Sequence, residues 1–278
     1  IATEMLQVCE SLAIKVASPK YKAKLKNQCI FYTSKAQALG EVPTQKNRIA
    51  FPYYHGDPVT SRRFAEYFAT IESFKEKICR IQVSHTRMKS LILETGIQAS
   101  KVFQIPISID LNHFPIRQSS FKRQLRAVHG IPDSAIVLGS FQKDGEGMKK
   151  GNQPKLIKGP DIFIEVVAAL RRIEPNLHVL LTGPARGYVE SGLKKLGVPY
   201  RHLKFSSYAE VATLYNALDL YLVTSREEGG PRSILESMAS RVPIVSTPVG
   251  QAVDLIEHEE NGWISNSFDV AELTALCE

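Results

Sequence analysis

Two carboxylates, Glu228 and Glu236, stand eight residues apart on either side of the turn Gly229-Gly230-Pro231. Glycine lets a backbone approach a ligand closely, and proline is favourable at the first position of a helix, where its missing N–H would be unpaired anyway. The glycine amides and the positive end of the following helix favour a diphosphate or the hydroxyls of a bound sugar. The segment therefore predicts a site for phosphate and sugar groups.

A simpler interpretation of the same acids is an exposed ion pair. Arg232 and Glu236 are four residues apart, a spacing worth about 0.2–0.5 kcal/mol on a helix surface, and Glu228 would then be solvated. However, residues 220–225 read as a buried strand and residues 226–230 as a loop. Ligands of parallel α/β domains bind outside the carboxyl ends of the strands, so the two acids stand where a site is expected.

The elements that must position these residues follow a regular alternation. From residue 136 onward, short β-rich runs alternate with helical patterns, which is typical of a parallel sheet with crossover helices. The predicted strands are residues 136–141, 177–183, 200–205, 220–225 and 243–247. The second strand ends at Gly183, which we expect to approach the ligand. The pattern predicts a doubly wound α/β domain.

The amino-terminal half contains fewer strands. We expect strands within residues 47–58, 78–96 and 101–107, which is three or four rather than the six or so of a complete nucleotide-binding fold. Residues 1–28 read as helical, with a lysine-rich run at residues 20–26, and residues 109–124 read as a linker.

The composition fits two domains and suggests neither a disulfide framework nor a zinc site. A chain of 278 residues with 44% hydrophobic content can bury two cores, and its four cysteines lack a CxxC pair or metal-ligand spacing. A cytoplasmic protein is expected, since no apolar run approaches the roughly 20 residues that span a bilayer and the start lacks the layout of a signal peptide. The chain opens with Ile1 and stops inside a helical pattern, which leaves open whether it is a fragment.

The charge is uneven along the chain. Residues 1–130 contain 20 Lys and Arg against 9 Asp and Glu, a balance of +11, which leaves −4 for residues 131–278 and +7 overall. A basic half attracts anionic lipid or a phosphorylated acceptor, and a solvated basic face is an equally open interpretation. No RNA-reading motif or aromatic platform accompanies the lysines, so no nucleic-acid partner is expected.

Around Glu228 and Glu236 the chain resembles the retaining GT-B glycosyltransferases of glycosyltransferase group 1, whose hallmark is a Glu-x7-Glu motif. The spacing of Glu228 and Glu236 fits it, and about 200 residues follow the family's order. The segments that carry the resemblance are residues 83–114, KGPDIFIEVV, LLTGPARG, LKFSSYAEVATLYNALDLYLVTSREEGGP and ESMASRVPIVSTPVGQAVDLIEHEENGWI. The resemblance implies two Rossmann-like domains facing a cleft. These are a short or truncated acceptor-side domain at 1–112 and a nucleotide-sugar-binding domain at 113–278.

The resemblance also implies roles for single residues. Glu228 would contact hydroxyls of the donor sugar and Glu236 the ribose, while Gly229, Gly230 and Pro231 would border the sugar and diphosphate. Lys158 matches the family lysine that neutralises the leaving diphosphate. The alternative is an ordinary lysine at the start of a helix, but the positive end of the helix dipole makes a cation unfavourable there.

Three further positions carry expectations of their own. Lys143 would substitute for a family arginine that is Ser140 here, and the basic loop at residues 143–158 would close over phosphates or form a flexible insertion. His55 falls where the family has a histidine facing the donor sugar, although it also fits a turn histidine. Arg241 replaces a family glycine, and a left-handed backbone there would cost about 1 kcal/mol.

The predicted activity is retaining transfer of a sugar from a nucleoside-diphosphate sugar to an acceptor hydroxyl, in the synthesis of a cell-surface glycan or a glycolipid. Neither a cofactor nor a metal is expected, since no DxD-like pair follows a strand. The acceptor would be a glycan or lipid-linked molecule, with peripheral contact at the cytoplasmic membrane face. A sugar-nucleotide epimerase, a phosphorylase and a degenerate donor-binding module remain the alternatives.

Overall fold

The structure, a computed structural model, describes residues 8–16, 26–32, 46–53, 55–147, 149–205 and 207–278. The chain forms two compact units, within residues 1–106 and within residues 107–278. Residues 8–11 are helical, but the helix predicted over residues 1–28 is wrong at residues 12–16 and 26–28, which are turns or irregular. The remaining residues of that prediction, including the lysines at positions 20, 22 and 24, lie outside the described residues.

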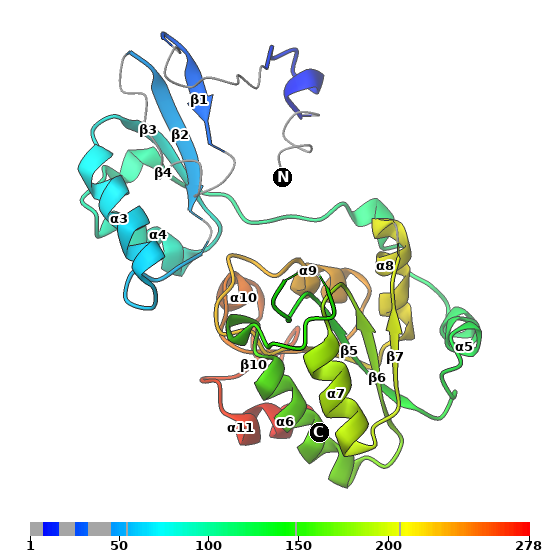
Figure 1. Ribbon diagram of the computed structural model, residues 1–278. Helices are drawn as coiled ribbons and strands as arrows, with labels where there is room; N and C mark the ends of the chain where they lie inside the picture. Colours follow the sequence, from blue (N-terminus) through cyan, green and yellow to red (C-terminus); the bar gives the residue numbers. More distant parts are fainter. Residues whose placement is uncertain (1–7, 17–25, 33–45, 54, 148, 206) are drawn as a thin grey trace. The chain divides into compact units, whose positions relative to one another are not determined.

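The first unit contains a parallel sheet of four described strands (Figure 1). The strands run in the order β1 (Cys29–Phe31), β2 (Arg48–Tyr53), β3 (Ile78–Val83) and β4 (Val102–Gln104). Helices α3 (Arg62–Phe74) and α4 (Thr86–Leu93) accompany them, and Tyr53 stacks on Tyr67 of α3 with ring centroids 5.3 Å apart. The predicted number of strands in this half is confirmed for the described residues.

The second unit contains a six-stranded parallel sheet in the order β10-β9-β8-β5-β6-β7. Read from β7, this is the 3-2-1-4-5-6 order of a Rossmann fold, with its switch point between β5 and β8. Four predicted strands end earlier than expected, and β10 was not predicted. The strands are β5 (Ile136–Phe141), β6 (Leu177–Thr182), β7 (Tyr200–Leu203), β8 (Leu220–Val223), β9 (Ile244–Ser246) and β10 (Trp263–Ile264).

Helices cover both faces of this sheet, because alternate strand residues point to opposite sides. Leu138, Val179 and Leu181 pack with α6 (Pro160–Ile173), α7 (Gly187–Leu196) and α11 (Val270–Ala275), which Figure 1 shows together on one face. Val137 and Leu180 belong to the core of the other face. The remaining helices of the unit are α5 (Ser119–Val128), α8 (Tyr208–Leu214), α9 (Arg232–Ala239) and α10 (Ala252–Leu255).

The linker predicted at residues 109–124 is wrong in part, because α5 begins within it. Arg126 is buried and donates to the carbonyl oxygens of Ala217 and Ala135, at 2.9 and 3.1 Å. Arg126 and Lys122 also pair with Asp219, at 2.5 and 2.6 Å. Asp219 lies 97 residues after Lys122 in the sequence. The local periodicity of the sequence therefore does not reveal what anchors the helix.

Arg241 has the left-handed backbone to which the cost given above applies, with φ of 57°. The N–H of Val242 donates to the carbonyl of Ser237, and that of Arg241 to the carbonyl of Met238, both at 3.0 Å. These two bonds form a Schellman motif at the end of α9, in which glycine is the usual residue. The motif holds although its central residue is arginine.

Candidate functional site

The switch point of the second sheet places two loops at its carboxyl edge. One follows β5 and leads through the 3-10 turn η4 (Leu156–Lys158) into α6. The other follows β8 and leads through residues 224–231 into α9. In this class of fold, the crevice outside the carboxyl ends of the switch-point strands is where ligands bind.

Lys158 and Glu228 meet across this edge. The Lys158 ammonium donates a hydrogen bond to Oε1 of Glu228, and the Ser225 hydroxyl donates to the same oxygen at 3.1 Å. The two charged side chains are largely buried, with 22% and 16% of their surfaces exposed. The structure therefore brings together a cation and a carboxylate that stand 70 residues apart. Together they match a ligand with both negative charge and hydroxyl groups.

The two loops are joined beside this pair. Arg226 donates to both carboxylate oxygens of Asp161, at 2.8 and 2.6 Å. The backbone N–H groups of Arg226 and Glu227 both donate to the carbonyl of Ile157, at 2.9 and 3.2 Å. The hydrogen bonds from Arg226 hold the pKa of Asp161 below its ordinary value. These contacts fix η4, and with it Lys158, against the loop that carries Glu228.

Gly159 explains why Lys158 is followed by glycine. Its φ is +61°, and a Cβ atom added there would lie 1.8 Å from the carbonyl oxygen of Thr224. The Thr224 hydroxyl also donates to the carbonyl of Gly159, at 2.8 Å. Only glycine permits this approach of η4 to the end of β8.

Glu236 is buried rather than exposed, with 7% of its surface accessible. Its Oε1 accepts a hydrogen bond from the phenol of Tyr208, and its Oε2 accepts one from the phenol of Tyr215, each at 2.7 Å. Arg232 is 3.9 Å from Oε1, and its guanidinium lies over the Tyr208 ring, 4.8 Å from the centroid. The ion pair of the simpler interpretation is therefore present, but its Glu236 side chain is buried, with 9% of the side-chain surface exposed.

The two tyrosines were not predicted from the sequence. They precede Glu236 by 28 and 21 residues, so no helical or strand spacing relates them to it. Burial first, and then interactions with Glu236, raise the pKa of Tyr208. For Tyr215, burial and then the neighbouring Tyr221 raise the pKa well above its ordinary value. Both phenols therefore remain protonated donors to the carboxylate at neutral pH.

The glycine-proline turn lies between the two glutamates as predicted, with a small shift of the helix start. Pro231 is the residue before α9, with φ of −63° and ψ of 114°, and the helix begins at Arg232. A Cβ on Gly230 would lie 2.6 Å from the Gln251 side chain. Gly229 is buried in the same turn.

Gln251 connects the glycine turn to the first residue of the second unit. Its Oε1 accepts from the N–H of Ile107 at 3.1 Å, and its Nε2 donates to the carbonyl of Ile107 at 3.2 Å. Gly250, next to it, has φ of +54°, and a Cβ there would lie 2.8 Å from the carbonyl oxygen of Glu228. The turn is therefore packed closely from this side.

Lys143 and Gly183 lie at the neighbouring carboxyl ends of β5 and β6. Lys143 is half-buried, two residues after β5. Gly183 has φ of +93°, and a Cβ there would lie 2.4 Å from the carbonyl oxygen of Gln142. Its carbonyl oxygen lies 2.7 Å from Nε2 of His202. Gly183 thus permits close packing of the two strand ends.

The basic loop that begins at Lys143 is anchored by a buried ion pair. Arg186 and Asp144 are 2.9 Å apart, and neither side chain is exposed. Arg186 also donates to the carbonyl oxygens of Ser140 and Thr182, at 2.5 and 2.8 Å. Further along the loop, the carbonyls of residues 150 and 151 accept hydrogen bonds from the first amides of α7. The loop is therefore built into the unit and is more than a plain insertion.

His55 belongs to the first unit. It follows β2 and is half-buried, and its ring meets that of Phe64 edge-on with centroids 6.0 Å apart. Gly56 has φ of +115°, which suits the turn here. The role of His55 toward a donor sugar stays a prediction.

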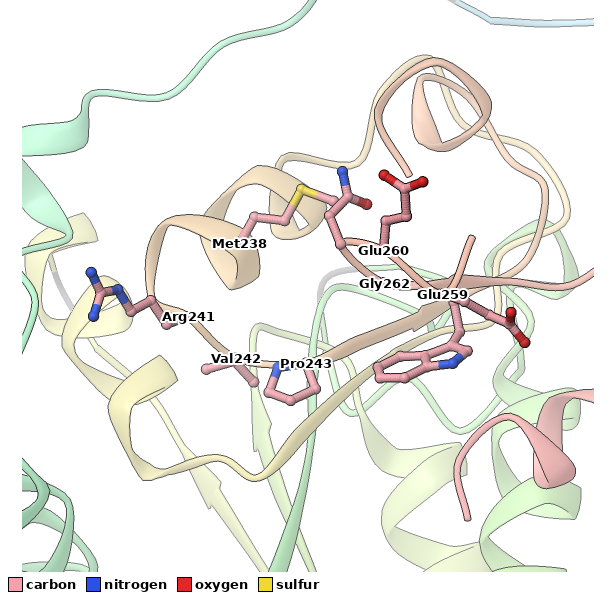
Figure 2. A pocket seen from close by; sticks show the side chains of 9 residues that line it. Met238, Arg241, Val242, Pro243, Glu259, Glu260 and Gly262 are labelled. Carbon is pink, nitrogen blue, oxygen red and sulfur yellow. The ribbon is translucent and has the colours of Figure 1, made fainter. Parts of the chain in front are cut away.

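A separate hollow lies at the far end of α9, where β9 begins (Figure 2). It has a volume of about 510 Å³ and is lined by Met238, Arg241, Pro243, Glu260 and Trp263, among others. Because it lies at the amino-terminal edge of the sheet, it is distinct from the crevice that holds Lys158 and Glu228.

Two general properties concern only the described part of the chain. In it, no helix is both long and apolar enough to cross a membrane. Nor do its histidines, cysteines and acids gather in groups of three or more that could hold a metal ion.

Comparison with curated proteins finds glycosyltransferases. Over 122 residues the chain is 34% identical to the lipopolysaccharide core biosynthesis mannosyltransferase LpsB of Rhizobium meliloti (strain 1021), covering 41% of this chain and 35% of that protein. Over 216 residues it is 32% identical to the uncharacterized glycosyltransferase MJ1607 of Methanocaldococcus jannaschii, covering 72% of this chain and 49% of that protein. The chain spans about a third to a half of the length of these relatives.

Solved structures show the same fold. Alr3699/HepE of Anabaena, solved in complex with UDP-glucose, matches with a TM-score of 0.71 at 20% identity, covering 89% of this chain and 67% of that one. The sucrose-phosphate synthase of Thermosynechococcus elongatus matches with a TM-score of 0.68 at 17% identity, covering 90% of this chain and 63% of that one. Residues 151–278 also match the family model described as Glycosyl transferases group 1. Residues 151–278 are thus similar to the group 1 glycosyl transferases, and the fold of the chain is the α/β fold of GT-B proteins.

Proposed function

We propose that the chain binds a nucleoside-diphosphate sugar and transfers the sugar, with retention and without a metal, to an acceptor hydroxyl. The observation that carries this proposal is the Lys158–Glu228 pair at the switch point, together with the buried Glu236 on α9, the helix that follows the glycine-proline turn. The relatives support it, since they are glycosyltransferases, and one similar structure contains UDP-glucose.

The charges at this site suit departure of a diphosphate. Lys158 would leave Glu228 for the diphosphate and neutralise the charge that develops on it, together with the amides of Gly229 and Gly230. Glu228, relieved of Lys158, would accept hydrogen bonds from the donor sugar, and Glu236 from the ribose. Because Lys158 supplies the positive charge, no metal is needed in this scheme.

Retention would follow from attack on the same face as departure, so no enzymic nucleophile is assigned. His55 would hydrogen-bond a sugar hydroxyl or help stabilise the oxocarbenium-like transition state. Lys143 and Gly183 would border the phosphates from the ends of β5 and β6. These assignments extend the family resemblance to the positions described above.

The site assignment is tested by binding measurements. Nucleoside diphosphates and their sugars should raise the apparent unfolding temperature, because a ligand that binds only the folded state stabilises it. In calorimetry, Glu236→Ala should weaken binding at least about tenfold, as expected for loss of hydrogen bonds to a charged group. Glu259→Ala, in the hollow near the far end of α9, is the control. Equal affinity of Glu236→Ala and wild type would refute the assignment.

The reaction itself is tested by product analysis. NMR with a labelled donor should show a glycoside of the same anomeric configuration as the donor. An epimerised donor, a sugar phosphate formed from free phosphate, or unchanged donor would instead identify an epimerase, a phosphorylase or a non-catalytic binding module.

The proposed acceptor is a glycan or lipid-linked molecule, reached from the cytoplasmic face of a membrane. The name of the Rhizobium relative, which refers to lipopolysaccharide core biosynthesis, supports this class of acceptor. The +11 balance of residues 1–130 supports contact with anionic lipid. Co-sedimentation with anionic vesicles should therefore weaken as salt rises, and binding insensitive to salt would contradict the electrostatic contact.

A further inference from the structure

The carboxylate of Glu236 can accept more hydrogen bonds than the two that it receives from the tyrosines. An ionised carboxylate has about four acceptor positions, two on each oxygen. Tyr208 occupies one on Oε1 and Tyr215 occupies one on Oε2. Counting donors from the described part of the chain, one acceptor position remains on each oxygen, which matches a pair of neighbouring hydroxyls on one ligand.

Tyr208 is itself held in place from several sides. Its ring meets the rings of His113 and Phe114 edge-on, with centroids 5.3 and 6.0 Å away, and the Arg232 guanidinium lies over it. At the start of α8, the Ser207 side chain caps the helix in a capping box with Glu210. A phenol fixed in this way fixes the oxygen that it donates to.

Tyr208 also differs from Tyr215 in its surroundings. Tyr215 is completely buried within the aromatic core, where its ring meets those of Phe141 and Tyr221. Tyr208 is half-buried, and the partly exposed Arg232 guanidinium lies over its ring. Removal of the Tyr208 hydroxyl therefore perturbs the carboxylate without opening a cavity in the core.

We infer that Tyr208 is a positioning residue that determines nucleotide specificity. It holds the Glu236 carboxylate so that both remaining acceptor positions face the vicinal 2′ and 3′ hydroxyls of a ribose. The site then selects ribonucleoside diphosphates over their 2′-deoxy counterparts. This inference rests on the proposed function, since it concerns the nucleotide of the donor.

The test compares two ligands in three proteins. Dissociation constants are measured by calorimetry for wild type, Tyr208→Phe and Tyr188→Phe. The ligands are the tightest binder among UDP, GDP and ADP, and its 2′-deoxy analogue. Tyr188 lies on α7, on the other face of the sheet from the Glu236 cluster, and is the matched control. The ratio of the two constants is the readout, because a change in the folded fraction alone does not alter it.

Wild type and Tyr188→Phe should bind the ribonucleotide about tenfold or more tightly than the deoxy analogue, as expected for one hydrogen bond to a charged group. In Tyr208→Phe this ratio should fall at least about threefold, mainly through weaker binding of the ribonucleotide. An unchanged ratio in Tyr208→Phe, or an equal fall in Tyr188→Phe, overturns the inference and leaves the donor site standing. Failure of wild type to bind any of the nucleotides overturns the proposed function and the inference with it.

Discussion

Arg226 donates to both carboxylate oxygens of Asp161, and this bidentate pair joins the loop after β8 to the first turn of α6. Lys158 and Glu228 lie on the two segments that it joins. The pair is partly exposed, with 36% and 26% of the side-chain surfaces accessible, so its contribution to stability is modest. Its larger consequence is geometric, because it keeps the cation and the carboxylate of the candidate site adjacent.

Asp161→Asn should lower the free energy of unfolding at pH 7 by about 1 kcal/mol or less. The hydrogen bond from Arg226 lowers the pKa of Asp161 below 3.8, so folding favours the ionised form. The stabilisation is thus fully present above pH 3.8 and is lost as the pH falls through the lowered pKa of the folded state. Urea unfolding of both proteins between pH 7 and pH 3 measures this. A difference that grows on acidification would contradict it.

Lys158→Ala should weaken binding of a nucleoside diphosphate and lower kcat by about 10²–10³, the loss typical of removing one electrostatic group from a transition state. Steady-state kinetics with the identified donor and acceptor measure the effect. Lys149→Ala, an exposed lysine of the same loop, should retain wild-type values. Equal losses in both variants would show that the effect comes from the positive charge of the loop as a whole and not from the position of Lys158.

Arg186→Met should destabilise the second unit by about 3–5 kcal/mol, because it leaves Asp144 buried without its countercharge. Burial raises the pKa of Asp144, and the Arg186 charge opposes that rise. The double variant Arg186→Met/Asp144→Leu removes both charges and should recover part of the loss. Urea unfolding at pH 7 provides the comparison, and a double variant less stable than the single one would contradict the assignment.

Arg241→Gly should raise the free energy of unfolding by about 1 kcal/mol, because glycine has no steric penalty at φ of 57°. Gly197 gives the matched reverse change. It ends α7 with φ of +64°, and an added Cβ would meet nothing within 4 Å. Gly197→Ala should therefore cost about 1 kcal/mol through the backbone alone. Thermal or urea unfolding should therefore show changes of opposite sign in the free energy of unfolding of the two variants. A destabilised Arg241→Gly would show that contacts of the arginine side chain stabilise the fold by more than the backbone strain costs.

Much of the second unit was predictable from the sequence because its signals are local. The strands from β5 to β9 are short apolar runs bounded by turn residues, and α6 shows helical spacing of its apolar residues. The left-handed backbone at Arg241 followed only conditionally from the family glycine that it replaces, because many helix ends adopt this conformation but not all do. The spacing of Glu228 and Glu236 is also local, and it located the turn between them.

Only the tertiary structure decided what surrounds those residues. The partner of Arg226 is 65 residues away and the phenols on Glu236 are 28 and 21 residues away, so no periodicity relates them. The first part of α5 has no helical signal of its own in the sequence, and its anchor, Asp219, lies directly before β8. The burial of Glu236 likewise depends on two tyrosines, one in α8 and one directly after it, that contact the carboxylate only in the folded unit. Local spacing determined which residues stand at the loops of the sheet; contacts between distant segments determined which pairs carry charge, which acid is buried and which donors hold it.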